Sequence, residues 1–140
     1  MLRGQPGRAG RRVRRLPEDL RRRVLGQRRR RPLVSSCIGW TGVGPTGNGL
    51  FQSGTAAQGT WEAGIEDYKV LKNRPGTRFR DTAAGALWLY DGTNWWSYDD
   101  PTVVAQKTAY VKQKGLGGVM VWELDGDDGT LTTAVDTGLR

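Results

Sequence analysis

The residues best suited to chemistry lie together near the end of the chain. The run 117–128 reads Gly-Gly-Val-Met-Val-Trp-Glu-Leu-Asp-Gly-Asp-Asp, an apolar segment that ends in Trp122 and a cluster of carboxylates. An indole is a large apolar surface with one polar edge. Trp122 at this position therefore suggests a platform for a flat, weakly polar ligand such as a sugar ring, with a core tryptophan as the alternative.

The carboxylates of this run invite an acid–base pair or a calcium loop. The sequence Asp-Gly-Asp-Asp-Gly at 125–129 lacks the spaced oxygen ligands and the distal glutamate of an EF-hand. We therefore expect Glu123, Asp125, Asp127 and Asp128 to form a polar loop that caps the helix after it, without a metal or another cofactor.

Other catalytic residue types are scarce. The chain has no histidine, which removes the commonest metal ligand and general base and excludes a Ser-His-Asp or Cys-His triad. Its one cysteine, Cys37, excludes an internal disulfide and provides no metal cluster.

The clearest positioning element is a helix predicted over 101–114. Asp99 and Asp100 offer a cap and favourable charge, and Pro101 suits the first helical position. Gly115 ends the helix.

A strand over 116–124 follows this helix and carries Trp122 at its end, and a short helix is predicted over 130–138. This order is typical of an α/β barrel, which has its working residues at the carboxyl ends of its strands. A complete barrel needs roughly 200–250 residues, so we expect only part of one.

The middle of the chain has the signals of shorter elements. Thr60 is a candidate helix cap, and the run Asp91-Gly92-Thr93-Asn94 is a hairpin turn signal. The predicted elements are a strand at 33–38, a loop at 39–59, a helix at 62–73, a strand at 77–80, and a hairpin of strands 86–90 and 95–98.

Tryptophan is concentrated in the same part of the chain. All 12 aromatic residues lie between Trp40 and Trp122, and six of them are tryptophan. Because tryptophan is rarely buried completely, this density predicts a stacking surface as well as a core. Trp95 and Trp96 are expected to pack in the hairpin.

Residues 1–32 have a different composition. They contain 13 arginines, no lysine and no aromatic residue, and carry a net charge of +11, whereas residues 33–140 carry −3. Such a segment is expected to be disordered. It would bind nucleic acid only non-specifically, through phosphate charge, since it has no aromatic side chain for base stacking.

Membrane association is not expected. The chain has no apolar run of about 18 residues that could span a bilayer, and its N-terminus lacks the apolar stretch of a signal peptide. The sequence fixes neither the localisation nor the oligomeric state of this chain.

Residues 40–140 resemble the C-terminal part of family 18 glycoside hydrolases, the chitinases, and are most similar to the secreted actinobacterial type. The motifs appear in the order and at about the spacing of that family. They are Gly39-Trp40-Thr41-Gly42-Val43, Gly59-Thr60-Trp61-Glu62, Leu89-Tyr90-Asp91-Gly92 with Tyr98-Asp99-Asp100-Pro101, and Leu116–Asp125.

The resemblance implies an α/β fold, namely an incomplete (β/α)8 TIM barrel with the α+β chitinase insertion domain, and the composition adds a disordered arginine-rich tail. Residues 1–38 would be the tail. Residues 39–98 would hold the end of barrel strand seven, at 39–43, and the insertion domain. Residues 99–140 would be the C-terminal barrel segment, with a helix, strand eight and the final helix.

The resemblance also implies a reaction and a partner. The family hydrolyses the β-1,4 linkages of N-acetylglucosamine in chitin, with retention and with assistance from the substrate's acetamido group, and it is commonly secreted. Trp122 would form the floor under the sugar at the cleavage point. Trp61 and Glu62 would contact bound chitin or its oligosaccharides.

The catalytic signature of the family, Asp-x-x-Asp-x-Asp-x-Glu, does not occur in the chain; the nearest run starts at Asp125-x-x-Asp128 and continues with Thr130 and Thr132. No residue takes the role of the general acid. We therefore expect the fragment to be inactive as an enzyme. A non-catalytic carbohydrate-binding fragment and an arginine-rich nucleic-acid-binding protein are the alternatives.

The junction before the insertion also departs from the family. The family commonly reads Tyr-Gly-Arg-Gly-Trp there, whereas this chain reads Ser36-Cys37-Ile38-Gly39-Trp40. An arginine-only segment rich in glycine and proline is what a GC-rich gene gives in a wrong reading frame. Our hypothesis is that residues 1–38 stem from a shifted frame or a misassigned start.

Overall fold

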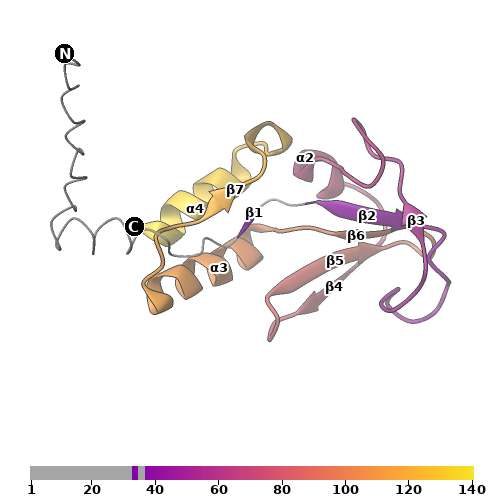
Figure 1. The fold of residues 1–140 in the computed structure, drawn as a ribbon, viewed down its shortest axis with the longest axis horizontal. Coiled ribbons are helices and arrows are strands. Elements are labelled where there is room, and N and C mark those ends of the chain that lie inside the picture. The colour runs from indigo at the N-terminus through magenta and orange to yellow at the C-terminus, as the bar shows by residue number, and fades with distance from the viewer. Residues whose placement is uncertain (1–32, 35–36) are drawn as a thin grey trace, which may run out of the picture.

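The structure of the chain is a computed structural model that describes residues 33–34 and 37–140. A five-stranded antiparallel sheet forms one end of the described part (Figure 1). The other end holds helices α3 (Pro101–Lys114) and α4 (Thr130–Leu139) and a short parallel strand pair. The predicted mixture of barrel-type and antiparallel parts is thus present.

The antiparallel sheet has the strand order β3-β2-β6-β5-β4. The predicted hairpin is confirmed as β5 and β6, and the Asp91 carboxylate closes its turn by accepting the backbone N–H groups of Thr93 (3.0 Å) and Asn94 (2.7 Å). The strands are β2 (Ile38–Thr41), β3 (Thr55–Ala56), β4 (Thr77–Asp81), β5 (Ala86–Tyr90) and β6 (Trp95–Ser97).

The prediction of a loop over 39–59 is wrong in part, because β2 and β3 pair within it, with Trp40 opposite Ala56. The glycine-rich sequence hides this pairing, which depends on β6 on the other side of β2. Residues 39–43, which we expected to leave barrel strand seven, lie in and directly after β2.

The parallel pair consists of β1 (Leu33–Val34) and β7 (Met120–Val121). The expected strand over 116–124 is shorter than predicted, because β1 is its one partner among the described residues. Val34 is fully buried. The strand predicted at 33–38 is confirmed in part, because Leu33–Val34 form β1 and Ile38 begins β2, so these residues do not belong to the disordered tail that we assigned to 1–38. The other part of that assignment, over 1–32 and 35–36, lies outside the described residues.

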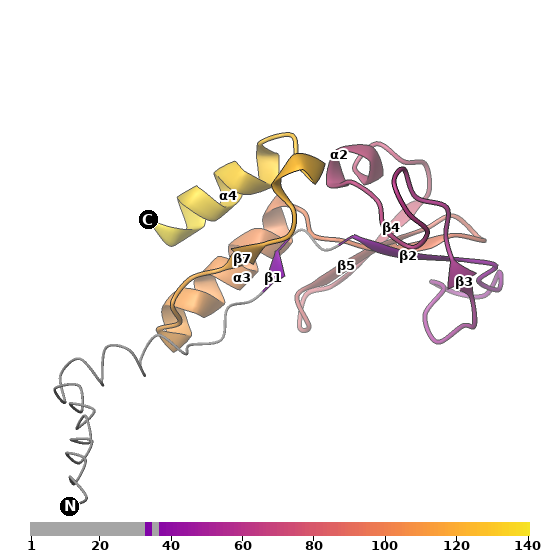
Figure 2. The same cartoon turned by 45° about the horizontal axis from the view of Figure 1, so that its top comes forward.

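Helix α3 forms where the sequence predicts it. The Asp100 carboxylate caps it by accepting the Val103 N–H at 2.9 Å, and Gly115 ends it in the left-handed conformation at φ 57°. Helix α4 lies along α3 (Figure 2). Gly138 allows this approach, since a Cβ there would lie 2.1 Å from the Thr108 hydroxyl.

We predict that Asp100→Ala lowers the free energy of unfolding by about 1–2 kcal/mol, the usual cost of a lost helix cap. Asp100 also accepts two hydrogen bonds from the Arg80 guanidinium, at 3.3 and 2.5 Å. Asp100→Asn is the matched control, because asparagine caps a helix as well as aspartate does. Urea denaturation tests the pair, and equal losses in both variants would contradict the capping role.

The predicted helix over 62–73 is wrong in its first half, since α2 spans only Tyr68–Leu71. Gly64 has φ 86°, and Ile65 forms a β-bridge to Ile38 and another to Glu62. The chain therefore makes a tight turn beside β2 before the helix begins.

The main core lies between the sheet and the helices. Trp96 is its largest fully buried side chain, and it lies flat against Gly39, where a Cβ would be 2.2 Å from the indole. A smaller cluster around Trp88 and Tyr90 covers the other face of the sheet. In the part of the chain that the structure describes, no helix is long and apolar enough to cross a bilayer.

Candidate functional site

Trp122 lies directly after β7, where the parallel pair ends. Its backbone N–H donates to the Val34 carbonyl at 3.0 Å, which fixes the main chain, and the peptide bond to Glu123 is cis. The side chain is 61% exposed. Trp122 is therefore a surface side chain on a held backbone rather than a core residue.

A small cavity of about 90 Å³ lies beside Trp122, between the C-terminal segment and the turn before α2. Both segments are far apart in the sequence, and the fold brings them to one cleft. Its lining residues are Cys37, Ile38, Ile65, Glu66, Asp67, Tyr68, Trp122, Glu123 and Gly126.

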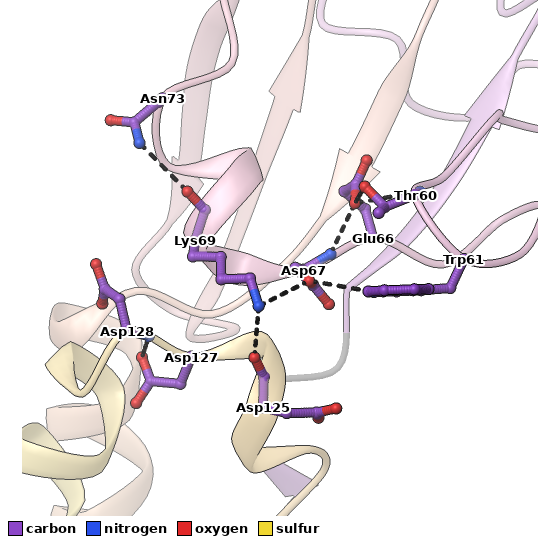
Figure 3. Close-up of polar contacts among 9 residues, drawn as sticks. All are labelled: Thr60, Trp61, Glu66, Asp67, Lys69, Asn73, Asp125, Asp127 and Asp128. Carbon is purple, nitrogen blue, oxygen red and sulfur yellow. Dashed lines mark hydrogen bonds and ion pairs between the residues drawn. The ribbon is translucent and has the colours of Figure 1, made fainter.

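Trp61 reaches the same cleft through Asp67. Its indole N–H donates to the Asp67 carboxylate at 3.4 Å (Figure 3). The Trp61 side chain is 78% exposed, whereas Asp67 is buried. Asp67 thus holds the exposed Trp61 indole and also lines the cavity beside Trp122, and this one carboxylate links the two tryptophans that the sequence singled out.

Glu62 follows Trp61 and has an exposed side chain. We expected it in the first turn of a helix, but it lies in the turn that Ile65 closes, where its carbonyl accepts the Ile65 N–H at 3.4 Å. The turn, and not a helix, presents Trp61 and Glu62 side by side to the solvent.

The acid that holds this turn is Glu66, which the sequence reasoning missed. Its buried carboxylate accepts the Thr60 hydroxyl at 2.6 Å and the Asp67 N–H at 3.0 Å, and pairs with the Arg74 guanidinium at 3.7 Å. The one available signal in the sequence was the pair of adjacent acids, Glu66 and Asp67, directly before an apolar helix face.

Two lysines, one in α2 and one directly after it, connect the turn to the C-terminal segment. The Lys69 ammonium group pairs with Asp67 at 3.2 Å and donates to the Asp125 carbonyl at 2.7 Å (Figure 3). Lys72 pairs with Asp128. Gly126 lies so close to Asp67 that a Cβ would be 3.1 Å from its carboxylate, so direct contacts join the turn before α2 to the segment after Trp122.

The carboxylates after Trp122 act as the predicted polar loop. Asp127 accepts the backbone N–H groups of Leu131 (3.1 Å) and Thr132 (2.8 Å), and so caps α4. Leu124–Gly126 form a short 3-10 turn before it. Among the described residues, no group of three acid, histidine or cysteine side chains is placed to hold a metal ion.

Charge contacts in this loop depend on pH. The hydrogen bonds and charge of Lys72 and the hydrogen bonds of Thr130 hold the pKa of Asp128 at about 2, below its ordinary 3.8. Because this pKa is depressed in the folded chain, the contribution of Asp128 to stability is present above pH 3.8 and is lost toward pH 2.

We predict that the urea midpoint of unfolding falls as the pH is lowered from 3.8 to 2, and that Asp128→Asn makes this fall shallower. Asp136→Asn, which removes an exposed carboxylate at the far end of α4, serves as the control. Identical pH profiles for the two variants would contradict a role of the Lys72–Asp128 pair in holding the loop.

Cys37 lines the cavity but is not suited to chemistry. Burial, together with the charges of Asp99, Asp67 and Glu66, raises the pKa of its thiol to about 12. The reactive thiolate is therefore negligible at neutral pH.

Comparison with known proteins identifies the family of the chain. The family model described as "Glycosyl hydrolases family 18" matches residues 34–127, which include Val34 of β1, all of β7, the antiparallel sheet and the Trp122 loop. The chain belongs to family 18 of the glycosyl hydrolases. The match starts at Val34, upstream of Gly39, where the first of the family motifs begins.

Individual relatives of this family 18 chain are chitinases. It is 50% identical over 105 residues to chitinase 63 of Streptomyces plicatus, covering 73% of this chain and 17% of that protein. It is 46% identical over 98 residues to chitinase A1 of Niallia circulans, covering 64% and 14%. The chain thus spans less than a fifth of the length of these curated relatives.

Solved structures agree with the fold of the family 18 chain. The catalytic domain of psychrophilic chitinase B from Arthrobacter TAD20 matches with a TM-score of 0.65 and 44% identity, over 78% of this chain and 25% of that one. A mutant class V chitinase from Nicotiana tobaccum in complex with NAG4 matches with a TM-score of 0.64 and 27% identity, over 74% and 32%. The chain has the α/β fold of these enzymes, as part of a TIM barrel with the insertion domain.

Proposed function

We propose that the chain is a groove segment of a chitinase, which binds N-acetylglucosamine units of chitin through Trp122, Trp61 and Glu62. The observation that carries this proposal is the exposed Trp122 indole on a fixed backbone, lining a cleft whose Asp67 accepts the Trp61 indole N–H. Strands β1 and β7 would correspond to barrel strands seven and eight.

The chemistry of the cleft suits a pyranose ring. Sugar rings have faces of C–H groups, and stacking these faces on indoles removes apolar surface from water. This burial stabilises the complex by about 25 cal/mol for each Å² of apolar surface. The exposed Glu62 carboxylate would accept hydrogen bonds from sugar hydroxyl groups. Asp67 accepts the Trp61 N–H and so orients that indole.

The proposal separates binding from catalysis. In a whole enzyme of this family, a general acid from another part of the barrel would protonate the leaving oxygen while the substrate's acetamido group attacks the anomeric carbon. The 140 residues contain no Asp-x-x-Asp-x-Asp-x-Glu run. Trp122, Trp61 and Glu62 would hold the sugar for that reaction without exchanging protons with it.

The test is to incubate the full chain with the N-acetylglucosamine tetramer, measure binding by the change in tryptophan fluorescence, and analyse the sugar by mass spectrometry. We expect saturable binding and an intact tetramer, while a chitinase with the catalytic motif cleaves it. Release of shorter sugars would overturn the predicted inactivity, and absence of binding would overturn the proposed groove.

A further inference from the structure

A second aromatic surface lies on the face of the antiparallel sheet that α3 does not cover. Four rings from neighbouring strands form a row, with centroid distances of 5.7 Å, 6.4 Å and 5.4 Å between successive members. The members of this aromatic row are, in order, Phe79, Trp88, Trp95 and Trp40. They share a face because directly paired residues, and residues two positions apart along a strand, point to the same side of a sheet. Phe79 pairs with Trp88, Trp40 pairs with Trp95, and Trp95 lies opposite Tyr90, two residues after Trp88.

The loop over 42–54 covers the middle of the aromatic row and leaves one end open. The Trp88 indole N–H donates to the Asn48 carbonyl at 2.9 Å, and the Tyr90 hydroxyl donates to the Gly44 carbonyl. Trp40, at the end of the row, remains 39% exposed. This loop lies at the end of the sheet away from α3 and α4, in both views (Figures 1 and 2).

A cavity of about 420 Å³ opens between the loop and the end of the row. Among the described residues, its lining holds aromatic, aliphatic, amide and hydroxyl groups and no charged side chain. The lining residues that matter here are Trp40, Trp95, Leu50, Phe51, Gln52 and Ser53. An uncharged lining matches an uncharged ligand, because burying an unpaired charge there would be costly.

Two features of this cavity do not serve the stability of the folded chain. Phe51 is fully exposed, and its φ of 60° lies in the left-handed region. That backbone conformation is unfavourable for a bulky residue and is usually adopted by glycine. The indole N–H of Trp95 is covered, and within the described part of the chain it has no hydrogen-bond acceptor. A ligand would explain the exposure and the strained backbone of Phe51 by stacking on its ring, whereas the covered Trp95 N–H lies out of its reach.

We propose that this cavity is a second carbohydrate site, which takes a neutral pyranose ring between Trp40 and Phe51. The alternation of flat apolar rings with the Gln52 amide and the Ser53 hydroxyl fits a sugar, which has C–H faces and hydroxyl edges. The site does not involve Trp122 and stands or falls independently of the proposed groove. It would hold a polysaccharide chain at a second point and so increase avidity for an insoluble substrate.

The test uses the full chain with Trp61→Ala and Trp122→Ala, so that the groove is disabled, and the N-acetylglucosamine tetramer as the probe. Indole N–H signals in NMR spectra report each remaining tryptophan. We expect the signals of Trp40 and Trp95 to shift saturably with the tetramer. Absence of any shift at both residues up to about 10 mM sugar would overturn the second site.

Phe51→Ser sharpens the test, since the side chain is fully exposed and its loss leaves the core intact. We expect at least a tenfold weaker affinity in this variant, by analogy with aromatic anchors that dominate binding sites. Tyr110→Ser, on the exposed face of α3, is the matched control and should leave the affinity unchanged. If the NMR signals shift with the protein concentration and not with the sugar concentration, the surface is a self-association site, and the proposal is overturned.

Discussion

Replacing Gly39 by alanine should lower the free energy of unfolding by about 3 kcal/mol, at the upper end of the usual cost of overpacking. Gly39 lies opposite Trp96 where β2 pairs with β6, and its Cβ would be 2.2 Å from the indole. Trp96 is 0% exposed, so its ring has no solvent to move into. Either β2 separates from β6 or the indole leaves its favoured rotamer.

Urea denaturation followed by circular dichroism measures this effect, with Gly44→Ala as the control. The nearest atom to a Cβ at Gly44 is the amide oxygen of Gln52, 2.9 Å away at the end of a flexible side chain. We expect a change below about 0.5 kcal/mol there, as for most surface substitutions. Equal stability of the Gly39 variant and the unchanged chain would contradict the packing of Trp96 on β2.

Replacing Trp122 by alanine should weaken binding of the N-acetylglucosamine tetramer at least tenfold, or about 1.4 kcal/mol. The indole is 61% exposed in the free chain and fixed at its backbone. A sugar face can therefore cover the Trp122 indole without the entropic cost of ordering a loop. Stability should change little, because an exposed side chain contributes little to the core.

Isothermal titration calorimetry measures this loss. Tyr110→Ala is the matched control, since Tyr110 is also an exposed aromatic residue, at 51%, but lies on α3 outside the cleft. We expect the control to bind as the unchanged chain does. A Trp122→Ala variant with full affinity would remove this residue from the proposed groove.

Local signals in the sequence were sufficient for α3 and for the β5–β6 hairpin. The cap at Asp100, the proline after it and Gly115 define the two ends of α3, and the turn at Asp91 joins neighbouring strands. Each of these elements depends on contacts within a few residues.

Elements that depend on distant partners were predicted less well. The pairing of β2 with β3 and β6 joins segments separated by glycine-rich sequence without alternating polarity. Strand β7, which directly precedes Trp122, is short because its extent follows its partner β1, and no local pattern encodes that partner.

The residues of the candidate site also divide into those with a signal in the sequence and those that meet only in the folded chain. Trp122 stood out because of its place after an apolar strand, and Trp61 and Glu62 because of the family motif. Asp67, which links Trp61 to the cleft, lies 55 positions before Trp122 and meets its neighbours only in the folded chain. Buried acids such as Glu66 and Asp67 are identified by their hydrogen bonds, which a sequence does not list.

The most direct test of the proposed groove is an NMR titration of the full chain with the N-acetylglucosamine tetramer, read at the indole N–H signals. We predict saturable shifts of the Trp122 and Trp61 signals, while the signal of the buried Trp96 stays unchanged. A spectrum in which Trp122 and Trp61 stay unchanged at saturating sugar would contradict it.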